Sequence, residues 1–125
     1  MEASNYVKFC TKFYENLYRR RRNDLSVVQI LSNIYASVGN KKCSLRMDRR
    51  CVHLDPFNPL AHYNLACDLS LNGKVNEAIG TLKAAFALGY DDLQWLCDDV
   101  DLDPIRHHSK FKTLIKSRFF RTSSK

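Results

Sequence analysis

Apolar residues recur along most of the chain at spacings of three and four, which is the period of an α-helix that buries one face. The clearest stretch covers residues 25–38 and stops at Gly39, and similar stretches precede Gly73 and Gly89. Glycine often ends a helix because it adopts the left-handed backbone conformation without a steric penalty. Runs that alternate apolar and polar residues are short, so the pattern predicts an all-α fold of several short helices.

The helical pattern also repeats itself along the chain, with a period of 34 residues. A shift by this period places Leu31 on Leu65 and Gly39 on Gly73. Small residues coincide under the same shift, and they are Ser32 with Ala66, Ser44 with Ala78, and Cys51 with Ala85. Since small side chains let two antiparallel helices approach closely, each period predicts one helix–turn–helix unit.

The period and the link between the two units resemble the tetratricopeptide repeat (TPR). The link reads Leu54-Asp55-Pro56-Phe57-Asn58-Pro59, where the prolines end one helix and begin the next. The resemblance implies a right-handed helical-repeat stack of antiparallel helix pairs, with units at 25–58 and 59–92. Two positions depart from the family pattern. Asp48 replaces a bulky apolar residue, for which Met47 is a substitute, and Gly89-Tyr90 replaces the usual Asp-Pro.

The two ends of the chain are less regular, as a repeat stack requires of its terminal units. Residues 93–119 are similar to the degenerate repeat and capping helix that close many bacterial TPR arrays, on the strength of Asp101-Leu102-Asp103-Pro104-Ile105-Arg106 and a following Phe111. Residues 5–22 are predicted to form one N-terminal helix, and residues 120–125 a flexible tail. We therefore expect residues 1–125 to form a single TPR-like domain.

Charge divides the chain into three segments. Residues 1–50 carry 11 basic and 4 acidic side chains, residues 51–104 carry 2 and 9, and residues 105–125 carry 7 and none. The formal net charge of +7 therefore describes no single surface. The segregation indicates a charge-polarised scaffold whose ends and middle engage different partners or, in a homo-oligomer, each other.

Cysteine spacing and hydropathy bear on the compartment. The five cysteines are widely spaced without a C-x-x-C pair, which indicates free thiols, mostly small buried side chains, in a reducing compartment. No apolar run is long enough to span a membrane, and no secretory signal is evident. We expect a cytoplasmic protein without a membrane span.

No set of residues predicts catalysis, a cofactor or a metal site. The four histidines have no nucleophile or carboxylate at a spacing typical of a triad. The acidic run from Asp91 to Asp103 lacks the spacing of a calcium loop, and helix capping explains such residues. The sequence predicts that the protein is not an enzyme.

The resemblance implies binding of a protein or peptide instead, because TPR stacks line a concave groove with the first helix of each pair. Carried over position by position, the family's groove residues in this sequence are Gln29, Asn33, Ser37, Tyr63, Cys67, Ser70 and Leu71. The predicted function is a non-enzymatic scaffold or adaptor that holds a peptide or a partner helix.

A basic run, Arg19-Arg20-Arg21-Arg22, supports an alternative function. With the basic C-terminal tail it would bind nucleic acid, another anion or an acidic partner. A solvated helix end is the other interpretation, because cations at the C-terminal end of a helix are favoured by the helix dipole, although four in succession exceed what capping needs. Nucleic acid is the less favoured partner. Charge-driven self-association is the third hypothesis.

Overall fold

A computed structural model describes residues 2–120, which contain helices and turns and no strand. The chain divides into two compact units, unit 1 (residues 1–56) and unit 2 (residues 57–125). The all-α prediction is confirmed for the described residues. The predicted N-terminal helix 5–22 is present as α1, Glu2–Arg20. Of the predicted tail, residues 121–125 lie outside the described part of the chain.

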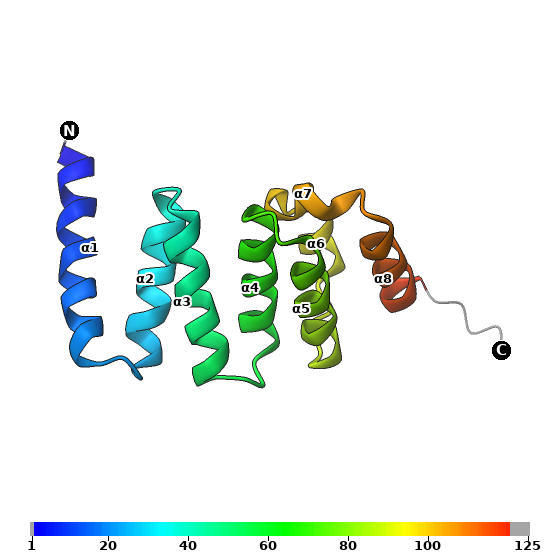
Figure 1. The fold of residues 1–125 in the computed structure, drawn as a ribbon, viewed down its shortest axis with the longest axis horizontal. Coiled ribbons are helices and arrows are strands. Elements are labelled where there is room, and N and C mark those ends of the chain that lie inside the picture. Colours follow the sequence, from blue (N-terminus) through cyan, green and yellow to red (C-terminus); the bar gives the residue numbers. More distant parts are fainter. Residues whose placement is uncertain (1, 121–125) are drawn as a thin grey trace. The chain divides into compact units, whose positions relative to one another are not determined.

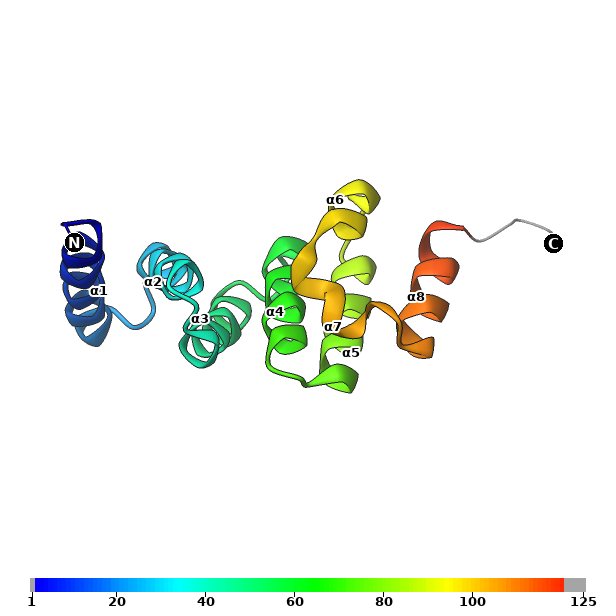
Figure 2. The same ribbon diagram turned by 90° about the horizontal axis from the view of Figure 1, so that it is seen from above.

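Unit 1 consists of α1, α2 (Leu25–Ser37) and α3 (Lys41–Leu54), which lie side by side with neighbours antiparallel (Figures 1 and 2). One core cluster of buried side chains in this unit consists of Val28, Leu31, Tyr35, Met47 and Cys51. Tyr14 and Tyr18 of α1 pack against this core. The hydroxyl of Tyr35 donates a hydrogen bond of 2.5 Å to Glu15, which joins α2 to α1 at one more point.

Unit 2 begins with a second antiparallel pair, α4 (Pro59–Leu71) and α5 (Val75–Ala87). Four short elements follow, namely α6 (Leu93–Asp98), the 3₁₀ helix η1 (Val100–Leu102), α7 (Asp103–Arg106) and α8 (Ser109–Phe119). Leu96, Leu102, Ile105 and Phe111 anchor them as buried side chains. The degenerate terminal segment thus contributes to the core of unit 2, as its apolar positions predicted.

The small residues that recur with the 34-residue period are all buried between paired helices, with exposed fractions of 6% or less. In unit 1 they are Ser32, Ser44 and Cys51, and in unit 2 they are Ala66, Ala78 and Ala85. This burial supports the interpretation that they permit a close approach of the helices.

Equivalent glycines end the first helix of each pair in the same way. Gly39 and Gly73 both have φ of +75°, which L side chains rarely adopt. The amide after each glycine donates to a carbonyl five residues back, from Asn40 to Tyr35 at 2.9 Å and from Lys74 to Leu69 at 2.9 Å. These are the bonds of a Schellman motif, so the turn glycines have the structural role that the sequence predicted.

Asp48, which departs from the family pattern, is buried at the α2–α3 contact with 7% of its surface exposed. The Ser32 hydroxyl donates a hydrogen bond of 2.6 Å to its carboxylate. The neighbouring Met47 is 2% exposed and fills the core, as the sequence suggested. The apolar residue of the pattern is therefore replaced by a buried polar pair beside a shifted apolar side chain.

Among the described residues, no helix combines the length and the apolar character that crossing a membrane requires.

Candidate functional site

The predicted groove residues of the first pair lie on the exposed side of α2. Gln29, Asn33 and Ser37 are all exposed. They are separated by four residues each, so they follow one face of the helix. This part of the predicted surface is open to a partner.

The predicted groove residues of the second pair lie in a different environment. Tyr63, Cys67 and Ser70 are buried, with exposed fractions of 1%, 6% and 0%, and Leu71 is half-buried. Residues of η1 and α7 pack against α4, and Asp99 contacts two of these side chains. The expectation of an open groove is therefore revised in unit 2, because the chain covers this face of α4 itself.

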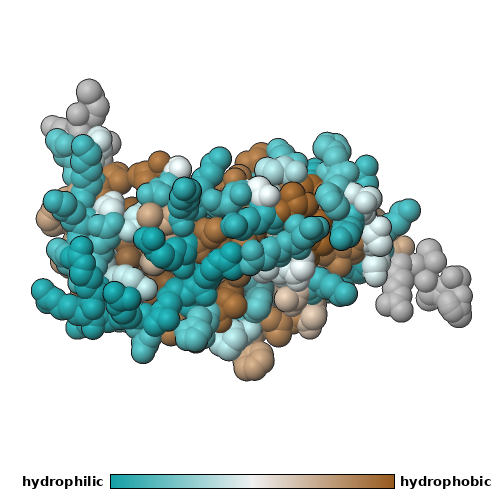
Figure 3. Space-filling view, in the orientation of Figure 1, coloured by the Kyte–Doolittle hydropathy of each residue, from teal (hydrophilic) through white to brown (hydrophobic). Residues whose placement is uncertain are grey.

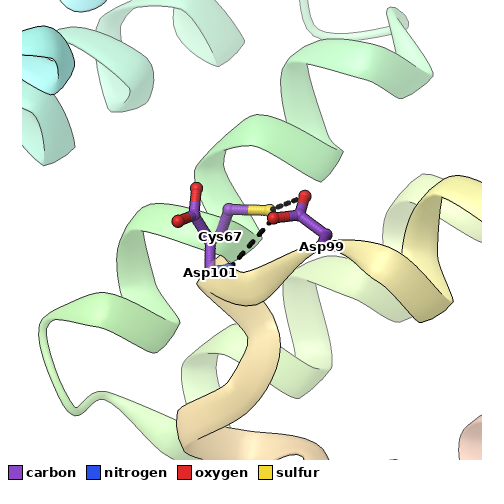
Figure 4. A group of neighbouring side chains, drawn as sticks. All are labelled: Cys67, Asp99 and Asp101. Carbon is purple, nitrogen blue, oxygen red and sulfur yellow. Dashed lines mark hydrogen bonds between the residues drawn. The ribbon is translucent and has the colours of Figure 1, made fainter.

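Asp99 is the centre of this covering contact. Its Oδ2 accepts hydrogen bonds from the Tyr63 hydroxyl at 2.7 Å and the Cys67 thiol at 3.5 Å. Its Oδ1 accepts the backbone N–H of Asp101 at 3.0 Å and so caps η1. Figure 4 shows the Cys67 thiol and the Asp99 carboxylate pointing toward one another. Arg106 adds a bond of 2.6 Å to the Asp99 carbonyl.

Burial and this carboxylate determine the protonation of the neighbouring groups. Burial raises the pKa of the Cys67 thiol, and the negative charge of Asp99 raises it further. Burial also raises the pKa of Tyr63, and it raises the pKa of Tyr90, whose ring stacks on Tyr63, to about 12. Cys67 therefore remains a protonated thiol, which is a weak nucleophile.

Cys67, Asp99 and Asp101 bring one sulfur and two carboxylates together, with ligand atoms within 4.8 Å of one another. Such a set is compatible with a divalent metal, but the hydrogen bonds among the three residues already account for its arrangement. The thiol proton and the Asp101 amide both point at the Asp99 carboxylate (Figure 4). We interpret the set as a structural contact that joins α4 to η1.

A second concave surface lies in unit 1, along α1. It is a groove of about 660 Å³ lined by Ser4, Val7, Lys8, Thr11, Lys12, Glu15 and Val38. Both lysines are exposed, whereas the Glu15 carboxylate accepts the hydrogen bond from Tyr35. The rim of the groove therefore carries positive charge. This groove could not be predicted from the sequence, because Val38 lies in a turn and its position beside α1 depends on tertiary packing.

The basic run Arg19–Arg22 is exposed throughout, at the C-terminal end of α1 and in the turn that follows. Arg19 donates to Asn16, Arg21 lies 3.9 Å from the Asp24 carboxylate, and the Arg22 guanidinium lies 5.5 Å from the centre of the Tyr18 ring. These local contacts fit the interpretation of a solvated helix end. An exposed salt bridge of this kind contributes little, about 0–1 kcal/mol.

The most exposed aromatic residues of unit 1 lie on α1, opposite its packed face. Tyr6, Phe9 and Phe13 are 69%, 67% and 51% exposed, and the two phenylalanine rings stack with centroids 6.4 Å apart. Only Tyr14 and Tyr18 pack on the unit 1 core, because one helix cannot turn two faces toward α2.

All five cysteines are free of disulfides, and their burial differs from the expectation. Cys51 and Cys67 are buried, Cys10 and Cys43 are half-buried, and Cys97 is exposed. The prediction of buried thiols is therefore confirmed in part. The cytoplasmic location stays a prediction.

Hydrophilic side chains cover much of the face seen in Figure 3, with hydrophobic residues showing between them.

No protein-family model matches the chain, and a search of curated proteins finds no match.

Proposed function

We propose that this chain is a non-enzymatic protein-interaction scaffold of the TPR type, and that unit 1 holds a peptide segment of a partner. The groove along α1 carries this proposal. It offers a concave surface of about 660 Å³, which is the size range of pockets that hold a few side chains. Its apolar residues include Val7 and Val38, and Lys8 and Lys12 provide the charge.

The TPR assignment is supported by the equivalence of the two helix pairs. Gly39 and Gly73 are 34 residues apart and have the same φ and the same capping bonds. The small residues buried between the helices recur at the same interval. This agreement between sequence period and backbone geometry is what a two-unit repeat requires.

The chemistry of the groove indicates which peptide would bind. An apolar side chain would contact Val7 and Val38, while acidic residues on either side of it would lie near Lys8 and Lys12. The exposed polar residues of α2 would extend this surface, since Val38 follows Ser37 directly. The proposed ligand is therefore a short acidic peptide with an apolar anchor.

Selection from a random peptide library tests this function. We expect enrichment of sequences that combine an apolar anchor with acidic neighbours. Lys8→Glu together with Lys12→Glu should weaken an enriched peptide by at least about tenfold, in the range of a lost charge pair at an interface. Lys42→Glu is the matched control, because Lys42 is exposed on α3 and does not line the groove. Absence of enrichment, or an equal loss in the control, would contradict the proposal.

A second candidate function, binding of nucleic acid or another polyanion, is favoured by a basic row on α3. Lys42, Arg46, Arg49 and His53 are exposed at spacings of four, three and four residues, so they share one helix face. Arg19–Arg22 are further exposed basic residues of unit 1. Binding of a DNA oligomer should then weaken with salt at a log–log slope of about −0.9 per neutralised phosphate. Arg46→Ala with Arg49→Ala should reduce that slope, and lack of binding at low salt would exclude this candidate.

A further inference from the structure

We propose that the protein associates head to tail with a second copy of itself, through two exposed surfaces that differ in charge. The first is the aromatic face of α1 in unit 1, formed by Tyr6, Phe9, Phe13 and Arg20. The second is the hollow between α6 and η1 in unit 2, formed by Trp95, Asp98, Asp99 and Val100. This association uses neither the groove of the proposed function nor its lysines.

The aromatic face of α1 is a projecting surface. Phe9 and Phe13 stack on one another while more than half of each side chain is exposed. Arg20 follows Phe13 by two helical turns, so it lies on the same face and is itself exposed. Exposed aromatic residues that gather on one face of a helix are typical of interaction surfaces, whereas single ones are common anywhere.

The α6–η1 surface is concave and acidic. Trp95 and Val100, which are 61% and 70% exposed, line a hollow of about 210 Å³ together with Asp98 and Asp99. A hollow of this size accepts a phenyl ring. Two of the four lining residues are aspartates and none is basic. Arg106 lies nearby, and its guanidinium donates to the carbonyls of Leu96 and Asp99 and to the Asp103 carboxylate.

The two surfaces are complementary in shape and in charge. Phe9 or Phe13 would enter the hollow between Trp95 and Val100, and Arg20 would approach the carboxylate of Asp98. Aromatic side chains in a desolvated pocket with charges at the rim are the usual energetic centre of an interface. This complementarity commits the proposal to a second copy, because a matching acidic and aromatic-lined hollow is present on this chain itself.

The geometry of such a contact has a direct consequence for the oligomer. Each copy uses a different surface from the one it meets, so the contact is heterologous. Heterologous contacts join copies into open chains or closed rings, and the associated fraction should rise with concentration.

Sedimentation velocity of the full chain at low ionic strength tests the proposal. We expect the weight-average sedimentation coefficient to rise with protein concentration and to fall toward the monomer value at high salt, since rim charges are screened. Phe9→Ser with Phe13→Ser in one variant, and Trp95→Ser with Asp98→Asn in another, should each weaken association by at least about 30-fold. A concentration-independent monomer at low salt would overturn the proposal.

Mixing the two variants gives the decisive result. The first variant keeps the α6–η1 hollow and the second keeps the α1 face, so together they should form a 1:1 complex that grows no further. If the second variant still self-associates while the first does not, two α1 faces pair with one another and the head-to-tail proposal is wrong. Phe57→Ser is the matched control, because Phe57 is 81% exposed outside both surfaces and its loss should leave association unchanged.

Discussion

The hydrogen bond from Tyr63 to Asp99 should make a measurable contribution to the stability of unit 2. Tyr63→Phe removes only the hydroxyl that donates to Asp99 Oδ2 at 2.7 Å. The aromatic ring remains, and with it the stacking on Tyr90 at a centroid separation of 4.3 Å. The substitution therefore removes the hydrogen bonding of one hydroxyl without opening a large cavity.

The expected cost follows from the environment of this bond. Tyr63 is 1% exposed, and a hydrogen bond to an ionised group contributes about 1.5–3 kcal/mol. Asp99 keeps the Cys67 thiol and the Asp101 amide as donors, so its carboxylate is not left without partners. We therefore expect the lower part of that range, a loss of about 1.5–2 kcal/mol in the free energy of unfolding.

Urea unfolding followed by tryptophan fluorescence measures this loss locally. Trp95 is the single tryptophan of the chain and lies in α6 of unit 2. Far-UV circular dichroism of the same samples follows the helices of both units. The two signals together distinguish a loss confined to unit 2 from a loss that affects the whole chain.

A double-mutant cycle with Asp99→Ala decides whether the bond itself is responsible. In the Asp99→Ala background, the Tyr63 hydroxyl has lost this acceptor, so Tyr63→Phe should cost nothing or should stabilise unit 2. An equal cost in both backgrounds would refute the reasoning. So would a cost below about 0.5 kcal/mol in the parent chain, since that is the lower limit for an ordinary intramolecular hydrogen bond.

Four further substitutions test the repeat and the charges around it. Gly39→Ala should lower the free energy of unfolding, measured by thermal unfolding, by about 1 kcal/mol. The cause is the left-handed φ of +75° alone, because an added Cβ meets no atom within 4 Å. Gly80→Ala, inside α5 and equally uncrowded, should instead raise that free energy by about 0.5–1 kcal/mol. Ser32→Ala should cost about 1–3 kcal/mol in urea unfolding by removing a donor to buried Asp48, and the double change with Asp48→Leu should recover most of this loss. Burial and neighbouring carboxylates raise the pKa of Asp101, so its charge disfavours the folded state at neutral pH, and this penalty disappears as the pH falls through the folded pKa. Asp101→Asn should therefore raise the urea midpoint at pH 7 and lose that advantage in acid, and a gain that persists in acid would contradict this assignment.

The local part of the fold could be predicted from the sequence because it depends on local rules. Helix period, turn glycines and prolines act within a few residues, so the ends of α2, α4 and α5 just before Gly39, Gly73 and Gly89 and the start of α4 at Pro59 follow from them. Asn58 illustrates this, since its side chain accepts the amide of Leu60 at 2.9 Å just before Pro59 starts α4. Such capping needs no information from distant residues.

The exposure of the candidate site could not be predicted in the same way. The resemblance to the TPR implied an open groove at Tyr63 and Cys67. Both are buried and donate hydrogen bonds to Asp99, which is more than 30 residues away along the chain. The α1 groove likewise depends on how Val38 approaches a helix that precedes it. Burial of this kind is determined by tertiary packing, which no local pattern encodes.

In the acidic middle of the chain, some carboxylates form hydrogen bonds within the fold and others are exposed to solvent. Asp92 accepts the amide of Trp95 at 3.0 Å and caps α6, and Asp99 caps η1 while fastening it to α4. These carboxylates are held by the fold, so only part of the negative charge that the sequence suggested faces a partner. Asp98 belongs to that part, because it is exposed at the rim of the hollow beside Trp95. The surface that remains is small, acidic and partly apolar, which suits one projecting aromatic face with a cation beside it better than a broad basic partner.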